Sequence, residues 1–131
     1  MITYQLPWNK GCWFKNLIIS KNITMTRKVL IAKFNYSIPT GELEIKMLGA
    51  ATKFSEIPGC CWKIWLFNED QKEAGGVYLF ETDVELEQFL KSNLFASVTQ
   101  NKAFSNFQTH TFSISEPASI ITGAPLIKKG V

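Results

Sequence analysis

The sequence contains few of the residues from which metal and redox sites are built. Among its 131 residues there are three cysteines and one histidine. Common zinc sites take three or four Cys, His or carboxylate ligands at characteristic spacings, and Cys12, Cys60, Cys61 and His110 have no such spacing. Cys60 and Cys61 are neighbours in a predicted strand, so they point to opposite faces and a disulfide between them is not expected. We therefore expect no metal.

The sequence marks of common cofactor sites are also absent. There is no Gly-x-Gly-x-x-Gly after a strand, no Walker loop and no Cys-x-x-Cys-His. These are the usual marks of dinucleotide, nucleoside triphosphate and c-type haem sites. No cofactor is expected on these grounds.

Long apolar runs and clustered positive charge are missing as well. No uninterrupted apolar run reaches the ~18 residues that cross a bilayer, and Pro7 and Lys10 interrupt the N-terminus where a signal peptide would be apolar. The net charge is +3, and the lysines are mostly dispersed, whereas a nucleic-acid-binding protein usually clusters them on one face. These features predict a cytoplasmic protein without a membrane or nucleic-acid partner.

The composition and periodicity that remain predict one α+β domain. Hydrophobic residues make up 46% of the chain, which suits a single packed core at this length. The apolar patterns predict the order β-α-β-β-α-β, with a four-stranded antiparallel sheet and helices on one face. The expected elements are a strand at 29–36, a helix opened by Pro39 and Thr40 with an apolar stripe to Phe54, two strands within 60–80, a helix after the capping box Thr82-x-x-Glu85, and a strand at 104–114.

Residues 58–80 are the segment most suited to form a site. Pro58-Gly59 predicts a turn into a strand where alternation places Cys61, Lys63 and Trp65 on one face and Cys60, Trp62 and Ile64 on the other. Both faces are largely apolar, so we expect the strand to be covered on both sides. Gly75-Gly76 is expected to open the next strand and to leave room beside the tryptophans.

This segment also carries a resemblance to a known family. Pro-Gly-x-x-Trp-Lys-x-Trp, then Glu-Ala-Gly-Gly-x-Tyr-Leu-Phe, and later Ser115-Glu116-Pro117 resemble the YdhR-like mono-oxygenases, a branch of the dimeric α+β barrel superfamily, from about Lys28 to Leu126. The resemblance implies a ferredoxin-like subunit and a homodimer whose two sheets face one another. It also implies a pocket in which some relatives oxidise aromatic or polyketide substrates with molecular oxygen and no cofactor.

Hydrophobic burial predicts the same homodimer. Helices would cover one face of the sheet, and we expect residues such as Phe34 or Trp65 on the other. A soluble monomer does not normally expose so much aromatic area, so a second subunit is expected to cover that face.

Six residues are candidates for the site. Tyr78 and Trp65 are predicted to be catalytic, because quinone-forming relatives use an Asn, a Trp and a Tyr, although no Asn of this sequence aligns with theirs. Trp62, Lys63, Phe34 and His110 are predicted to line the substrate pocket. Several alternatives stay open. In them the aromatic residues are core or interface residues only, His110 is a surface residue, and Lys63 is an outward lysine paired with Glu69, Asp70 or Glu73.

The two ends of the chain give separate expectations. Residues 1–24 lie before the resemblance and are read either as an N-terminal extension or as an extra strand or lid, and residues 25–131 are read as the single domain. Ser115 to Val131 contains Pro117 and Gly123 and is expected to form an extended arm.

Two functions fit this sequence. One is a cofactor-independent mono-oxygenase that oxidises a small aromatic or readily deprotonated substrate with molecular oxygen. The other is a non-catalytic small-molecule binding module of the same fold.

Overall fold

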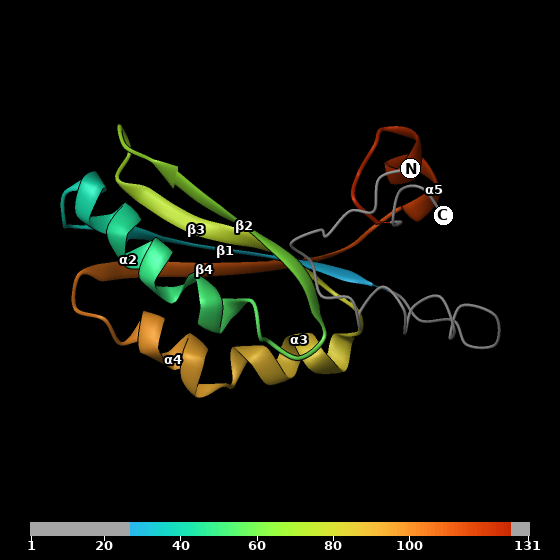
Figure 1. The fold of residues 1–131 in the computed structure, drawn as a ribbon, viewed down its shortest axis with the longest axis horizontal. Coiled ribbons are helices and arrows are strands. Elements are labelled where there is room, and N and C mark those ends of the chain that lie inside the picture. Colours follow the sequence, from blue (N-terminus) through green and yellow to red (C-terminus); the bar gives the residue numbers. More distant parts are fainter. Residues whose placement is uncertain (1–26, 127–131) are drawn as a thin grey trace.

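A computed structural model describes residues 27–126 as one sheet with helices packed against it (Figure 1). The elements in chain order are β1 (Lys28–Tyr36), α2 (Thr40–Phe54), β2 (Cys60–Asn68), β3 (Glu73–Phe80), α3 (Asp83–Leu90), α4 (Asn93–Thr99), β4 (Phe104–Ser113) and α5 (Glu116–Ile121). The four strands are antiparallel in the order β2-β3-β1-β4. The predicted ferredoxin-like α+β fold is confirmed, with α4 and α5 as additional helices. Residues 1–24, and therefore the expectation of an extension or lid, lie outside the described part.

Side-chain caps explain where two of the helices begin. The hydroxyl of Thr82 accepts the backbone N–H of Glu85 at 3.3 Å, as the capping box predicted. The hydroxyl of Ser92 accepts the N–H of Phe95 at 3.1 Å and starts α4. Leu94, Phe95 and Val98 of α4 then pack against the main core cluster. This short helix thus lies on the same face of the sheet as α2, next to β4 and α3.

The strand β3 begins earlier than expected, so its two glycines lie within the strand. A side chain on Gly75 would collide with the carbonyl oxygen of Ala32 on the neighbouring strand. Gly76 is paired with Trp65 of β2 and is buried. At both positions neighbouring atoms come so close to the backbone that a side chain would collide with them, a common reason for glycine inside a strand.

A bulge in β2 sorts its side chains between the two faces of the sheet. Cys60 is paired with Phe80 and Trp62 with Leu79, so Cys61 is the extra residue. Cys60 belongs to the core cluster under the helices, whereas Cys61 packs with Leu79 on the other face. The predicted alternation placed Cys61 with Lys63 and Trp65, which is wrong because of this bulge.

The helix-covered face carries Phe34 and Trp65, so their expected place on the open face is wrong. Trp65 packs against the core cluster that contains Phe54 of α2, and Phe34 packs against the cluster that contains Leu43 of the same helix. The open face instead carries two cross-strand rows, which are Trp62–Leu79–Val29–Phe112 and Ile64–Val77–Ile31–His110. Ile64 and Phe112 are about half exposed, at 50% and 52%.

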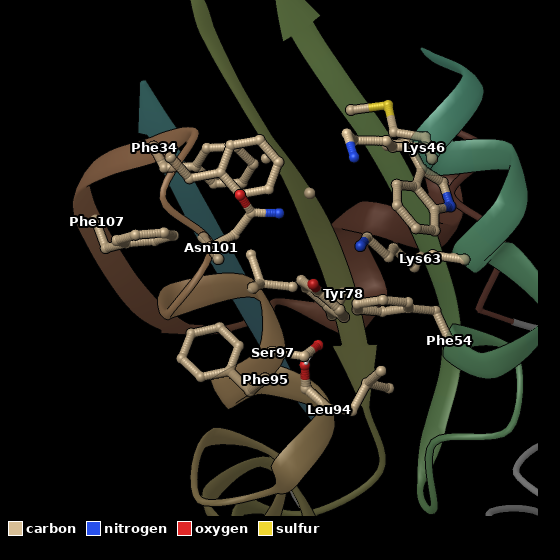
Figure 2. A pocket seen from close by; sticks show the side chains of 18 of the residues that line it. Phe34, Lys46, Phe54, Lys63, Tyr78, Leu94, Phe95, Ser97, Asn101 and Phe107 are labelled. Atoms are coloured by element: carbon tan, nitrogen blue, oxygen red, sulfur yellow. Dashed lines mark hydrogen bonds between the residues drawn. The ribbon is translucent and has the colours of Figure 1, made fainter. Parts of the chain in front are cut away.

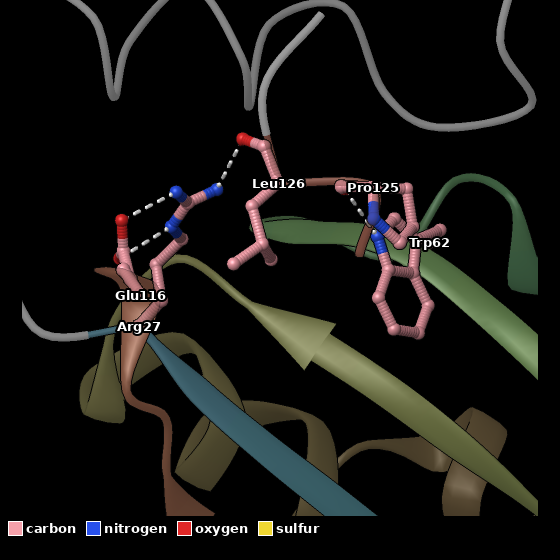
Figure 3. A network of polar contacts seen from close by, with 5 residues as sticks. All are labelled: Arg27, Trp62, Glu116, Pro125 and Leu126. Carbon is pink, nitrogen blue, oxygen red and sulfur yellow. Dashed lines mark hydrogen bonds and ion pairs between the residues drawn. The ribbon is translucent and has the colours of Figure 1, made fainter. Parts of the chain in front are cut away.

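The segment after β4 folds back and is not the extended arm expected from its prolines and glycines. Helix α5 lies beyond one end of the sheet (Figure 1), and Glu116 forms a two-pronged ion pair with Arg27 at 2.9 and 3.0 Å. Arg27 also donates to the carbonyl of Leu126, and Trp62 donates to the carbonyl of Pro125 (Figure 3). Leu126 is buried against Leu79. These contacts fix residues 115–126 against the start of β1 and the edge strand β2.

Within residues 27–126, no helix is long and apolar enough to cross a membrane.

Candidate functional site

A cavity of about 360 Å³ lies under the helices, between the sheet, α2 and α4. This volume lies within the range of small-molecule sites. Four of the six predicted site residues, Phe34, Lys63, Trp65 and Tyr78, line it (Figure 2). The other lining residues are Ala32, Leu43, Lys46, Met47, Gly49, Ala50, Lys53, Phe54, Gly75, Gly76, Leu94, Phe95, Ser97, Val98, Asn101, Phe104, Phe107, Gln108 and Thr109.

The amine of Lys63 is held among three aromatic rings at the sheet side of this cavity. Its Nζ atom lies 3.4 Å from the ring centre of Trp65, 3.8 Å from that of Phe54 and 4.7 Å from that of Tyr78. No carboxylate of the described residues pairs with it, and Glu73 instead lies 3.6 Å from Lys33. The expected outward ion pair of Lys63 is therefore wrong, since the side chain points inward.

Two effects act in opposite directions on the charge of this amine. Burial lowers the pKa of Lys63 from 10.5 to about 7, and the nearby Cys60 raises it more weakly. The ring faces of the cage favour the ammonium form. An amine with a pKa near 7 can take up or give up a proton at physiological pH, as a general base requires.

Gly76 makes room for this lysine. A Cβ atom added at Gly76 would lie 2.6 Å from Cε of Lys63 and 3.4 Å from the ring of Tyr78. The stem of Lys63 thus occupies the space that a side chain on β3 would fill. The predicted space is present at Gly76, where Lys63 fills it, but not at Gly75, where the backbone of Ala32 and Lys33 leaves no room for a side chain.

Tyr78 is buried in its ring but open at its hydroxyl. The residue is 4% exposed, and its ring packs against Phe80 and Phe89 at centroid distances of 6.0 and 5.1 Å. Burial, with a smaller effect of Cys60, raises the pKa of Tyr78 above its usual value. Its hydroxyl has no hydrogen-bond partner among residues 27–126 and faces the cavity (Figure 2). A protonated phenol there can donate to an oxygen of a ligand.

A second aromatic group lines the other part of the cavity. The ring of Phe34 lies 4.4 Å from that of Phe104 and 5.3 Å from that of Phe107. Between the two groups, Asn101 extends toward the cavity from the turn after α4 (Figure 2). Sequence reasoning missed Asn101, because it depended on helix α4, which was not predicted; the Ser92 cap was the available signal.

The structure does not bring Trp62 or His110 to this cavity. Trp62 packs on the Leu79–Leu126 cluster and lines only a smaller hollow of about 150 Å³ at the edge of β2. His110 is paired with Ile31 and lies on the open face of the sheet. Because the chain has one histidine, the cavity offers no imidazole to a haem iron.

Several solved structures have a similar fold. A protein from Shewanella oneidensis is 13% identical, with a TM-score of 0.57 over 71% of this chain and 95% of that chain. SnoaB, a cofactor-independent oxygenase from Streptomyces nogalater, is 15% identical, with a TM-score of 0.56 over 69% of this chain and 94% of its own. The haem degrader MhuD from Mycobacterium tuberculosis, with two haems bound in its active site, is 17% identical, with a TM-score of 0.51 over 66% and 94%. At these identities the likeness shows the fold alone.

A search of curated proteins found no match. A family model does match, over residues 29–125, which is more than half of the chain and agrees with the extent of the resemblance seen in the sequence. This chain therefore belongs to the family described as "Putative mono-oxygenase ydhR".

Proposed function

We propose that this protein is a cofactor-independent mono-oxygenase that oxidises a small, readily deprotonated aromatic substrate with molecular oxygen. The observation that carries the proposal is the Lys63 amine, which has a pKa near 7 and lies among three rings beside a cavity of ligand size. Family membership supports the reaction class. The similar fold of SnoaB, a cofactor-independent oxygenase, supports the absence of a cofactor.

Lys63 would act as the base in this reaction. In its neutral form the amine accepts a proton from an activated CH₂ group of the substrate, which becomes an electron-rich carbanion. The carbanion carbon then bonds to molecular oxygen, and the resulting hydroperoxide loses water when the second C–H proton leaves. The balance is R₂CH₂ + O₂ → R₂C=O + H₂O. The substrate carbon supplies all four electrons, so no external reductant is needed.

The other cavity residues would position the substrate and limit access of water. Tyr78 would donate its phenolic proton to a substrate oxygen, where negative charge develops on deprotonation. The rings of Trp65 and Phe54 would stack on the substrate and keep bulk water from the reacting carbon. The proposal thus gives Trp65 and Tyr78 the catalytic roles predicted from the sequence, which stay predictions.

We also infer that the protein acts as a homodimer through its open sheet face. Half-exposed Ile64 and Phe112 and the cross-strand rows that contain them form an apolar surface for a second copy. Sedimentation equilibrium at micromolar concentration is expected to give a dimer, and replacing Ile64 by Asp should shift it to monomer. A monomeric unmodified protein would reject this arrangement.

Oxygen uptake tests the proposed reaction. Anthrone-type compounds, which carry an activated CH₂ group, are supplied to the protein in an oxygen electrode, and one oxygen molecule should be consumed for each ketone formed, without release of hydrogen peroxide. Lys63→Met should abolish turnover, while Lys91→Met, which changes an exposed lysine outside the cavity, should retain it. Binding of the same compounds without oxygen consumption would favour the alternative, a non-catalytic binding module.

A further inference from the structure

The charged residues that line the cavity all have the same sign. They are Lys46, Lys53 and Lys63, and no aspartate or glutamate among residues 27–126 lines the cavity. None of the three lysines forms an ion pair with a carboxylate of residues 27–126. The cavity therefore has a positive potential that is not neutralised within the described part of the chain.

Lys46 is the one of the two α2 lysines whose direction is visible. The residue is exposed, and Figure 2 shows its side chain extending from α2 toward the cavity, so its ammonium lies at the cavity's solvent side. Exposed lysines normally extend into water, where the ammonium is best hydrated. An ammonium at the solvent side of an aromatic-walled cavity is placed to meet an anionic ligand.

Asn101 presents a donor to the same space. Its Oδ1 atom accepts the backbone N–H of Ala103 at 2.9 Å, which fixes the amide orientation. The Nδ2 group is therefore the half of the amide that is left for a ligand, and it faces the cavity in Figure 2. The hydroxyl of Ser97, by contrast, donates its proton to Leu94 within α4.

The polar groups thus form two sets on different elements. Lys63 and Tyr78 extend from the sheet, on β2 and β3. Lys46 and Asn101 come from α2 and from the turn after α4, which cover the sheet. All four can donate hydrogen bonds, and the lysine ammonium and the asparagine NH₂ cannot accept them. A ligand with oxygen acceptors at two separate positions on a flat ring would match both sets.

We propose that the substrate is an aromatic carboxylate, in which Lys46 and Asn101 hold the carboxylate while Lys63 and Tyr78 hold the reacting part. The proposal rests on the proposed function for the identity of the reacting part, but the anion site itself does not require turnover. Lys46 and Asn101 are then specificity residues for the ionised group, and a neutral analogue would leave the Lys46 ammonium without a partner.

Binding of a matched pair of probes tests the carboxylate site. The probes are 6-hydroxy-2-naphthoate and 2-naphthol, which share the ring and the hydroxyl and differ by a carboxylate at the far end of the ring system. Affinities are measured by titration calorimetry under nitrogen, so that no oxidation occurs. The unmodified protein should bind the carboxylate about ten-fold more tightly, as a charge-assisted hydrogen bond allows, and the preference should fall at high salt.

Variants identify the residues responsible. Lys46→Gln should reduce the preference for the carboxylate about two- to five-fold, the effect of a partly exposed ion pair. Adding Asn101→Ala to Lys46→Gln should reduce this preference further. Lys91→Gln is the matched control and should leave it unchanged. Equal affinity for the two probes, no binding of either, or an unchanged preference in Lys46→Gln would each overturn the proposal. A retained preference without any oxygen consumption would keep the anion site and reject the oxygenase function.

Discussion

Replacing Lys63 by Met should remove a specific pH dependence from the stability of the protein. The substitution keeps an unbranched side chain of similar size among the rings of the cage and removes the titrating amine. In the unmodified protein, burial holds the pKa of Lys63 at about 7, compared with 10.5 for an unperturbed lysine. Between these two values the unfolded chain carries the proton and the folded chain does not.

The sign and size of the effect follow from this difference. Because the unfolded state binds more protons in this window, the free energy of unfolding rises with pH, and it stops rising above the unfolded pKa. A difference of one bound proton changes the free energy of unfolding by at most about 1.4 kcal/mol per pH unit. The titration of Lys63 should therefore raise the free energy of unfolding by about 2 kcal/mol between pH 7 and pH 9. Above pH 9 the raised pKa values of Cys60, about 12, and of Tyr78 act in the opposite direction.

Urea denaturation at pH 6, 7, 8 and 9 measures this effect. The stability of the unmodified protein minus that of Lys63→Met should rise by about 2 kcal/mol from pH 7 to pH 9 and change little from pH 6 to pH 7. The control Lys91→Met, at an exposed position, should parallel the unmodified protein. Parallel profiles for the unmodified protein and Lys63→Met would refute the reasoning. They would mean that the rings stabilise the ammonium enough to cancel the cost of burial.

Three further predictions concern other parts of the site and the fold. Tyr78→Phe should slow turnover several-fold, about 1 kcal/mol, with little change in the denaturation midpoint, because the hydroxyl has no partner among the described residues; a large loss of stability would contradict its place at the cavity. Gly75→Ala should lower the free energy of unfolding by roughly 3 kcal/mol, because the new methyl group meets the backbone of Ala32 and Lys33. Gly76→Ala should lower it by only about 1 kcal/mol, because the new methyl group mainly displaces the end of the Lys63 side chain. Similar denaturation curves for the two variants would show that the two glycines do not differ in this way. Arg27→Ala should cost about 3 kcal/mol by removing the buried partner of the α5 carboxylate, and unchanged thermal unfolding would show that the segment after β4 contributes little.

Much of the fold could be predicted from local patterns. The stripe that ends at Phe54, the cap at Thr82 and the alternation of β1 gave elements within a few residues of those observed. Helix α4 was missed because seven residues are too few for a clear helical period, even though Ser92 caps it. The folded-back segment after β4 depends on the Arg27 ion pair, which joins positions 89 residues apart and leaves no local pattern.

The site was less predictable, because its residues meet through pairing between strands. Lys63 and Trp65 were placed together on one face of β2, but alternation alone does not say which apolar face the helices cover. The direction of Lys63 depended on that choice. His110 was placed in the pocket, whereas its pairing with Ile31 puts it on the open face. The roles of Tyr78 and Trp65 in catalysis stay predictions.

The space at Gly76 also constrains how this site can change in evolution. Lys63 and Gly76 are packed as one unit, since the stem of the lysine fills the volume that any other residue at position 76 would claim. Gly76→Ala should therefore cost less stability once Lys63 has been shortened to alanine, and the part of the cost that remains should come from the backbone oxygen of Ile64, 3.2 Å from the new Cβ atom. Among homologous sequences, the two positions are expected to vary together, so that relatives with a larger residue opposite Trp65 lack the caged amine.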